Sequence, residues 1–177
     1  MAAAVVVGLA FSSCGNGNPD AKPSTAYLYS FDGVNDTWCD RIDFRVMAVI
    51  PGELGRKYAS RSASDDGLSC TKLVSGEPWN HLIITVSVTF FKTAEAAKGS
   101  YERNTSADDA KLPVPADIDA KVSIKKNQRI ASAVHQNLRV MVILSGDTKT
   151  FAAHAVALEE ALPLFVAHVF KALRELI

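Results

Sequence analysis

The chain has 177 residues, of which 48% are hydrophobic and 21% charged, a composition typical of a folded protein rather than a disordered one. Its 19 Lys and Arg residues balance its 19 Asp and Glu residues, so the formal net charge is zero. General nucleic-acid binding depends on neutralising phosphates, so a chain without net positive charge is a poor candidate for that function.

The N-terminal segment has the pattern of an exported protein. An apolar run over residues 2–11 precedes Ser-Ser-Cys14 and a polar stretch rich in Gly, Asn, Pro and Ser. The run is too short for a bilayer span of about 20 residues but suits a signal peptide. The pattern resembles a bacterial lipobox, although Phe11 stands where Leu is usual and no Lys or Arg precedes the run. We predict a signal peptide over residues 1–13, lipidation of Cys14 and a flexible tether over residues 14–25.

The alternative is an apolar N-terminal strand that ends in a buried Cys14. If Cys14 carries lipid, Cys39 and Cys70 remain as an even pair, and two cysteines outside the cytoplasm normally form a disulfide. We therefore predict a Cys39–Cys70 bond with Cα atoms ~4.4–6.8 Å apart; in a cytosolic protein both would be reduced thiols. Because there is no Cys-x-x-Cys motif and no His at zinc-finger spacing, we predict no metal site.

Turn residues and the periodicity of apolar residues predict the elements in the first half of the folded part. We expect a bend at Asp32-Gly33, a short helix over residues 43–50 that Pro51-Gly52 stops, and a loop over residues 60–67. A strand around residues 68–74 and a clearer strand over residues 82–91 follow. In the clearer strand, the side chains expected to face a helix layer alternate with a half-exposed set; they are Leu82, Ile84, Val86, Val88 and Phe90.

The second half begins with a predicted helix over residues 94–103 and a polar loop that extends past Pro113 and Pro115. Two β-like runs then flank Gln136-Asn137, where Asn tolerates the left-handed conformation that a two-residue hairpin turn needs. This register pairs His135 with Leu138, Ala133 with Val140 and Ala131 with Val142. Gly146-Asp147 closes the second run.

A final helix is expected over residues 158–176. One face carries the apolar stripe Leu158, Leu162, Phe165, Val169, Leu173 and Leu176. Pro163 should mark the first turn or kink the helix. A second apolar strip, Val166, Ala167 and Phe170, is covered by the fold or offered to a partner. Together the elements predict an α+β fold over residues 26–177, a single domain whose antiparallel sheet carries a short N-terminal helix, a middle helix and a long C-terminal helix.

Three segments carry a resemblance to a known group of proteins: Thr37-Trp38-Cys39, Pro51-Gly52-Glu53-Leu54-Gly55 and Ser69-Cys70-Thr71. With the alternating strand, the Ala-rich helix, the hairpin and the C-terminal helix, they resemble the small secreted envelope lipoproteins of actinobacteria. The resemblance covers about Trp38 to the C-terminus. It implies a place on the outer face of the cytoplasmic membrane, one disulfide and a fold like that of PsbP. It carries over no catalytic residue.

Candidate chemistry is sparse. The sequence has no GxSxG, Gly-rich phosphate loop, HExxH or Cys-His signature. The four histidines are His81, His135, His154 and His168, and on one continuous helix the last two would lie ~21 Å apart, too far to share a metal. The remaining candidates are expected to be loop or cap acids (Asp65-Asp66, Asp108-Asp109, Glu159-Glu160), solvated basic clusters (Arg56, Lys57 and Arg61; Lys125, Lys126 and Arg129), and tryptophans in the core or a ligand cleft (Trp38, Trp79).

These observations favour a noncatalytic, lipid-anchored envelope protein, without cofactor or nucleic-acid partner, that binds a protein or an envelope ligand. One alternative is a carrier or sensor of small apolar molecules in a helix–sheet cavity walled by Val86, Val88, Phe165 and Val169. A third reading is a hydrolase whose residues converge only in three dimensions. A pocket holding a His with a carboxylate and a hydroxyl in hydrogen-bond reach would indicate that reading.

Overall fold

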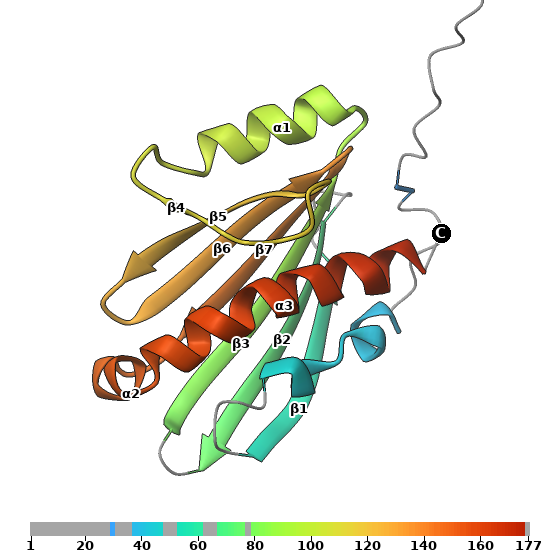
Figure 1. The fold of residues 1–177 in the computed structure, drawn as a ribbon. Coiled ribbons are helices and arrows are strands. Elements are labelled where there is room, and N and C mark those ends of the chain that lie inside the picture. The colour runs from blue at the N-terminus through green and yellow to red at the C-terminus, as the bar shows by residue number, and fades with distance from the viewer. Residues whose placement is uncertain (1–28, 31–36, 48–52, 62–66, 77–78, 176–177) are drawn as a thin grey trace, which may run out of the picture.

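The computed structural model describes residues 29–30, 37–47, 53–61, 67–76 and 79–175. An antiparallel sheet forms the centre of the molecule, and helices cover it (Figure 1). The predicted α+β fold class is therefore confirmed. The predicted signal peptide and tether, including the lipidation site, lie outside the described residues.

The sheet has seven strands in the order β1-β2-β3-β7-β6-β5-β4, and all neighbouring strands are antiparallel. Neighbouring strands of the sheet are consecutive in the chain, except at the centre, where β3 pairs with β7. The strands are β1 (Glu53–Arg61), β2 (Gly67–Gly76), β3 (Trp79–Phe90), β4 (Ala110–Lys111), β5 (Asp119–Lys125), β6 (Gln128–His135) and β7 (Leu138–Ser145).

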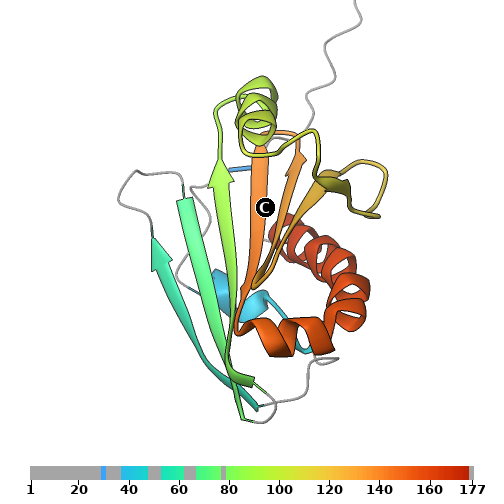
Figure 2. The same cartoon turned by 90° about the vertical axis from the view of Figure 1, so that its left-hand side faces the viewer.

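Most of the helical layer covers one face of this sheet. Figure 2 shows the long helix α3 and two short 3-10 helices on the same side of the strands, and helix α1 across one end. The helices are η1 (Trp38–Arg41), η2 (Phe44–Met47), α1 (Ala94–Arg103), α2 (Thr148–Ala153) and α3 (Ala155–Arg174). We call the α3 side of the sheet the inner side.

The inner side holds the main core. The alternation predicted for β3 is confirmed, because Leu82, Ile84, Val86, Val88 and Phe90 are all buried, whereas Ile83 on the other side is 39% exposed. Both apolar strips of α3 pack into the same continuous core, including Phe165, Val166, Val169 and Phe170. The fold itself therefore covers Val166 and Phe170 of the second strip, while Ala167 is half-buried.

The middle helix has the bounds that the sequence predicts. Thr93 caps its N-terminus, since the hydroxyl of Thr93 accepts a hydrogen bond from the backbone N–H of Ala96 at 3.1 Å. Ala97 and Tyr101 pack with Val134 of β6 in a small separate cluster. Because Val134 alternates with inner-side residues of β6, α1 covers the opposite side of the sheet at this end.

The hairpin between β6 and β7 has the predicted register, with His135 opposite Leu138 and Ala133 opposite Val140. The residue in the left-handed region, however, is Gln136, with φ of 51°, and not Asn137. Asn137 is buried instead, and its side chain bonds to other segments.

Several sequence predictions were wrong in detail. The segment before residue 60 is an edge strand, β1, and the polar loop after α1 contains β4 and leads into β5. In the segment where a helix is predicted up to residue 50, the structure has the 3-10 helix η2, residues 48–50 lie outside the described part, and a further 3-10 helix, η1, precedes η2. A separate helix, α2, precedes α3, which begins at Ala155 and continues through the buried Pro163.

Candidate functional site

Cys39 and Cys70 lie at disulfide distance, with Cα atoms 5.6 Å apart, which is inside the predicted range. Cys39 lies in η1, rather than ahead of the first helix, and follows the buried Trp38. Cys70 is a fully buried, inner-side residue of β2. The pair therefore attaches η1 to the sheet, and Trp38 packs in the core beside it, as predicted.

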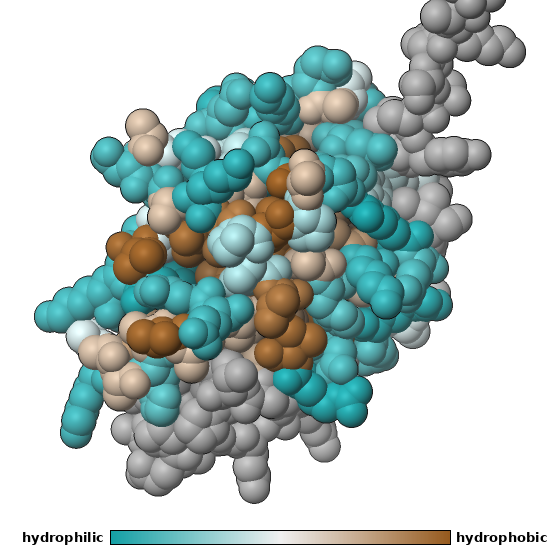
Figure 3. Space-filling view, viewed as in Figure 1, coloured by the Kyte–Doolittle hydropathy of each residue, from teal (hydrophilic) through white to brown (hydrophobic). Residues whose placement is uncertain are grey.

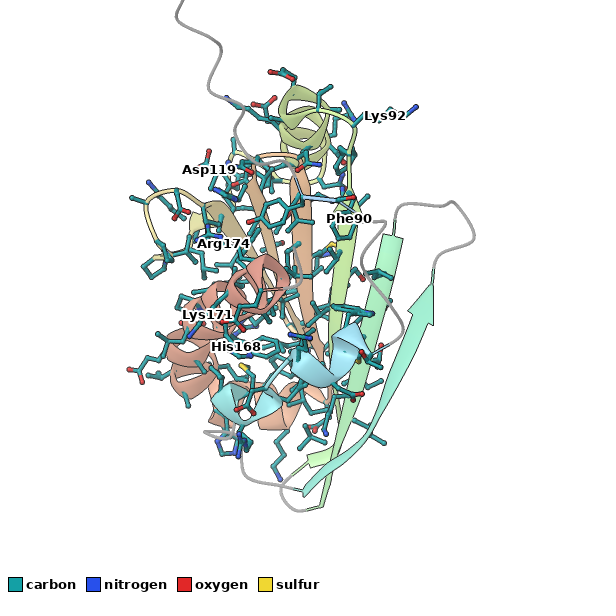
Figure 4. All side chains as sticks on the ribbon, turned by 90° about the vertical axis from the view of Figure 1, so that its right-hand side faces the viewer. Phe90, Lys92, Asp119, His168, Lys171 and Arg174 are labelled. Atoms are coloured by element: carbon teal, nitrogen blue, oxygen red, sulfur yellow. A yellow bond between two sulfur atoms is a disulfide. The ribbon has the colours of Figure 1, made fainter. Side chains whose placement is uncertain are left out.

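A polar network joins four segments at the C-terminal end of α3. The hydroxyl of Tyr29 is 2.8 Å from Nδ1 of His135 and accepts a hydrogen bond from Nε of Arg174 at 3.2 Å. Nε2 of His135 lies 3.4 Å from Oδ2 of Asp117, which also accepts from Arg174. Figure 4 shows Arg174 on α3 close to the segment that enters β5.

A neutral His135 fits the contacts of this network. In that form the Tyr29 hydroxyl accepts from Arg174 and donates its own proton to Nδ1 of His135. The imidazole proton then resides on Nε2, which faces Asp117. The neutral form of His135 satisfies every one of these contacts.

The pKa shifts agree with that assignment. Burial lowers the pKa of His135, and the positive charge of Arg174 adds to this, while Asp117 acts in the opposite direction. Burial raises the pKa of the Tyr29 hydroxyl, against the effect of Arg174. The hydrogen bond from Arg174 lowers the pKa of Asp117.

The carboxylate and the hydroxyl expected around a catalytic histidine are thus present at His135. Both ring nitrogens are nevertheless engaged within the protein, whereas a general base needs a nitrogen facing the substrate. The Tyr29 hydroxyl is also a weak nucleophile, because its pKa is raised rather than lowered. The network connects Tyr29, the β6–β7 hairpin, the segment before β5 and α3.

His168 has a structural contact as well. Its Nε2 accepts a hydrogen bond from the backbone N–H of Asp43 at 2.8 Å, so this side chain joins α3 to the start of η2 (Figure 4). Asp43 in turn binds Arg45, and this hydrogen bond lowers the pKa of Asp43 to about 2. No cluster of three or more potential metal ligands occurs among the described residues.

The charged candidates lie in different surroundings. Asp109 accepts a hydrogen bond from the backbone N–H of Ser106, the loop role predicted for it. Arg129 is buried and stacks near the ring of Phe151, so this part of the second basic cluster is not a solvated face as predicted. The guanidinium of Arg129 also lies 3.5 Å from Glu159. The side chains of the first basic cluster lie outside the described part.

We call the outward side of β2, β3 and β7, away from α1, the outer face. No helix in the described part of the chain covers it away from α1. Ser69 lies opposite Ser87, which lies opposite Met141, and the hydroxyls of Thr71 and Thr85 are 3.2 Å apart. The outer face consists of Ser69, Thr71, Leu73, Ile83, Thr85, Ser87, Thr89, Met141, Ile143 and Ser145.

None of these ten side chains is charged or aromatic, but Arg139 precedes Met141 on the same side of β7 and donates a hydrogen bond to the hydroxyl of Ser100 in α1. The side chains of the outer face are half-buried by one another, apart from the more exposed Ile83. Alternating hydroxyl and aliphatic groups on an open sheet face suit contact with another protein surface more than enclosure of a small molecule. The periodicity of β3 predicts four of these ten residues, but the pairing of β3 with β7 is a long-range feature.

No family model matches the chain, and no curated protein matches it. Among solved structures, the chain is similar to a GTP binding regulator from Thermotoga maritima, with a TM-score of 0.37 and 13% sequence identity. The match covers 74% of this chain and 86% of that one. A similarity of this size carries no inference about function. None of the described helices is long and apolar enough to cross a membrane.

Proposed function

We propose that this chain is a noncatalytic, lipid-anchored cell-envelope protein that binds a partner protein through its outer face. The observation that carries the proposal is the contrast between the two sides of the sheet. On the inner side, the core residues of β2, β3, β6 and β7 are buried under the helical layer, while the ten residues of the outer face are neutral and no helix in the described part of the chain covers them away from α1. A protein surface of similar size and neutral polarity is the partner that fits it.

The opposite side of the molecule is a weaker candidate. Figure 3, seen from the side of α3, displays a largely hydrophilic surface with scattered hydrophobic patches. The exposed apolar side chains, Ile124, Val156 and Leu164, come from different elements or different turns. Isolated apolar residues of this kind are normal on soluble surfaces.

The lipobox-like sequence at Cys14 and the cysteine pair support the proposed place in the envelope. Cys39 and Cys70 lie at disulfide distance, and such bonds persist outside the cytoplasm. The resemblance to actinobacterial lipoproteins agrees with an anchor on the outer face of the cytoplasmic membrane. Metabolic labelling with a palmitate analogue tests this: label should appear in the wild type and be absent after Cys14→Ala. Equal labelling of both would contradict the anchor.

Site-specific photo-crosslinking in intact cells tests the outer face. A photoreactive amino acid at position 83 should give one discrete protein adduct, because Ile83 is the most exposed residue there. Thr85→Arg should abolish the adduct, since it puts a charge on a neutral face. Glu160→Arg on α3 is the matched control and should leave the adduct unchanged. No adduct, or equal loss in both variants, would contradict the proposal.

The carrier alternative requires the helix–sheet interface to open. Val86, Val88, Phe165 and Val169, the expected cavity wall, are each at most 1% exposed and lie in one packed core. An apolar ligand would have to separate α3 from the sheet. Native mass spectrometry of protein purified from its host tests this alternative, because a carrier should retain a small molecule.

A further inference from the structure

A polar pocket of about 440 Å³ lies on the outward side of the sheet, next to the outer face, since the lining residues Ile130 and Ser132 pair with Ile143 and Met141; the Tyr29–His135 network lies on the other side of the sheet. Ser123 of β5 and Ile130 and Ser132 of β6 line it from the sheet. The end of α1 and the loop over residues 104–109 line it from the other side. This volume lies in the range of small-molecule sites.

One polar atom in the pocket has no partner. Ser132 is 3% exposed, and its hydroxyl forms no hydrogen bond within the described protein. Buried hydroxyls are nearly always hydrogen-bonded, because an unsatisfied one costs stability. The backbone of Ser132 already pairs with Lys121 and Met141 on the neighbouring strands, so the sheet does not need the hydroxyl. A bound molecule is the natural partner for it.

The charged lining favours an anion. Arg103 and Lys125 line the pocket, and neither forms an ion pair with the residues that the structure describes. Asp109 is the single carboxylate in the lining, and its Oδ2 is engaged by the backbone N–H of Ser106 at 2.7 Å. Two cations with no ion-pair partner against one engaged carboxylate leave a positive site.

The frame of the pocket is held by its own hydrogen bonds. The ammonium of Lys121 donates to the carbonyl of Ser106 at 2.9 Å and thereby ties the loop to β5. Asn104 and Thr105 donate to the carbonyls of Ser100 and Tyr101, which fixes the loop on the end of α1. These bonds leave acceptor oxygens on both side chains, so the lining offers acceptors for ligand hydroxyls as well as cations.

We propose that this pocket binds a small hydroxylated anion, a sugar phosphate or a sugar acid. Its phosphate or carboxylate is held by Arg103 and Lys125, and one of its hydroxyls is hydrogen-bonded to Ser132. A single sugar ring fits the volume, and the lining contains polar side chains and one aliphatic one, Ile130, without an aromatic ring. The site requires neither the lipid anchor nor the partner protein.

Calorimetric titration of the full chain with glucose 6-phosphate, glucuronate, glucose and inorganic phosphate tests the proposal. Glucose 6-phosphate or glucuronate, or both, should bind with a dissociation constant on the order of millimolar or tighter, and glucose at least about tenfold more weakly. Binding of glucose 6-phosphate would show that the site takes a phosphate group, and binding of glucuronate would show that it takes a carboxylate group. No binding of either sugar anion, equal binding of glucose, or inorganic phosphate binding as tightly as glucose 6-phosphate would overturn the proposal.

Variants locate the binding. Lys125→Ala should weaken it by at least about tenfold, because a charge-assisted contact is lost. Lys126→Ala is the matched control, since Lys126 is the exposed neighbour outside the lining, and should bind like the wild type. Ser132→Ala should weaken binding several-fold without lowering the melting temperature, because its hydroxyl has no partner in the fold. Unchanged binding in both pocket variants would overturn the proposal.

Discussion

The side-chain amide of Asn137 forms hydrogen bonds with both backbone polar groups of Tyr29, at 2.8 and 2.9 Å. The side-chain nitrogen of Asn137 also donates to the backbone carbonyl of Phe91 at 2.8 Å. In return, the backbone carbonyl of Asn137 accepts a hydrogen bond from the backbone N–H of Phe91. One buried side chain at the hairpin turn therefore replaces a strand as the pairing partner of Tyr29. It also holds the chain between β3 and α1.

Asn137→Ala should be strongly destabilising. The change removes the hydrogen-bond partner of the Tyr29 N–H and C=O groups and a donor to the Phe91 carbonyl. We expect the free energy of unfolding to fall by about 2–4 kcal/mol. Urea denaturation of the full chain measures it. Asn137→Asp is the control, since it keeps the acceptor and loses the donor, and we expect a loss at least as large because a charge is buried. A loss below about 0.5 kcal/mol in Asn137→Ala would contradict this account.

Gln136→Gly should stabilise the protein or leave its stability unchanged. Gln136 has φ of 51°, a left-handed conformation that costs a non-glycine residue about 1–2 kcal/mol. Glycine removes this cost, but its greater freedom in the unfolded chain offsets part of the gain in stability. Gln128→Gly at the start of β6 is the matched control and should destabilise by about 0.5–1 kcal/mol. The melting temperature should therefore fall in Gln128→Gly and should not fall in Gln136→Gly.

The elements that the sequence predicts well are those whose local pattern agrees with their final surroundings. Over residues 82–90 of β3, buried residues alternate with more exposed ones, and Thr93 marks the start of α1. The strand β1 was missed because ELGRKYASR is rich in charge. As an edge strand it pairs with β2 alone, and edge strands tolerate charged residues.

The candidate sites could not be predicted in the same way. Tyr29 and His135 are 106 positions apart, and Tyr29 and Arg174 are 145 apart, so no local spacing brings them together. The pocket depends on the pairing of β5 with β6, and β5 was hidden in a segment that reads as a polar loop after two prolines. Its alternation, with Ala120 and Val122 buried, was the available signal.

The stability of the protein should fall as the pH is lowered below about 6.5. The folded protein holds His135 at a lowered pKa, so the unfolded chain, with a His pKa of about 6.5, binds more protons in this range. The stabilisation is present above the unfolded pKa and is lost as the pH falls toward the folded one. Urea denaturation at pH 7.5 and 5.5 measures the change. The slope with pH should be smaller in His135→Gln, and an identical slope would contradict the assignment of a neutral His135.

Loss of the Cys39–Cys70 bond should cost roughly 3–4 kcal/mol by the chain-entropy relation. The sequence separation is 31, and the bond joins η1 to β2. The melting temperature of the wild type should drop on reduction, while that of the double variant Cys39→Ala, Cys70→Ala should be insensitive to reductant. Two free thiols in the oxidised wild type, after blocking of Cys14, would show that the bond does not form.

Two adjacent residues of α3 test how the helix packs on the sheet. Phe165 is fully buried and its ring lies 5.3 Å from that of Phe44 in η2, whereas Leu164 is 65% exposed. Phe165→Ala should destabilise by about 3–5 kcal/mol, because it removes a large core side chain and leaves a cavity. Leu164→Ala should change the unfolding free energy by less than about 0.5 kcal/mol.

The Leu164→Ala variant also tests whether the partner protein binds the outer face or the exposed side of α3. If the exposed side of α3 were a binding surface, Leu164→Ala would reduce the photo-crosslinked adduct while leaving stability unchanged. We expect the adduct from position 83 to be retained in Leu164→Ala, because Leu164 and Ile83 lie on opposite sides of the sheet. Denaturation and crosslinking of the same two variants therefore separate the core role of α3 from any role in binding.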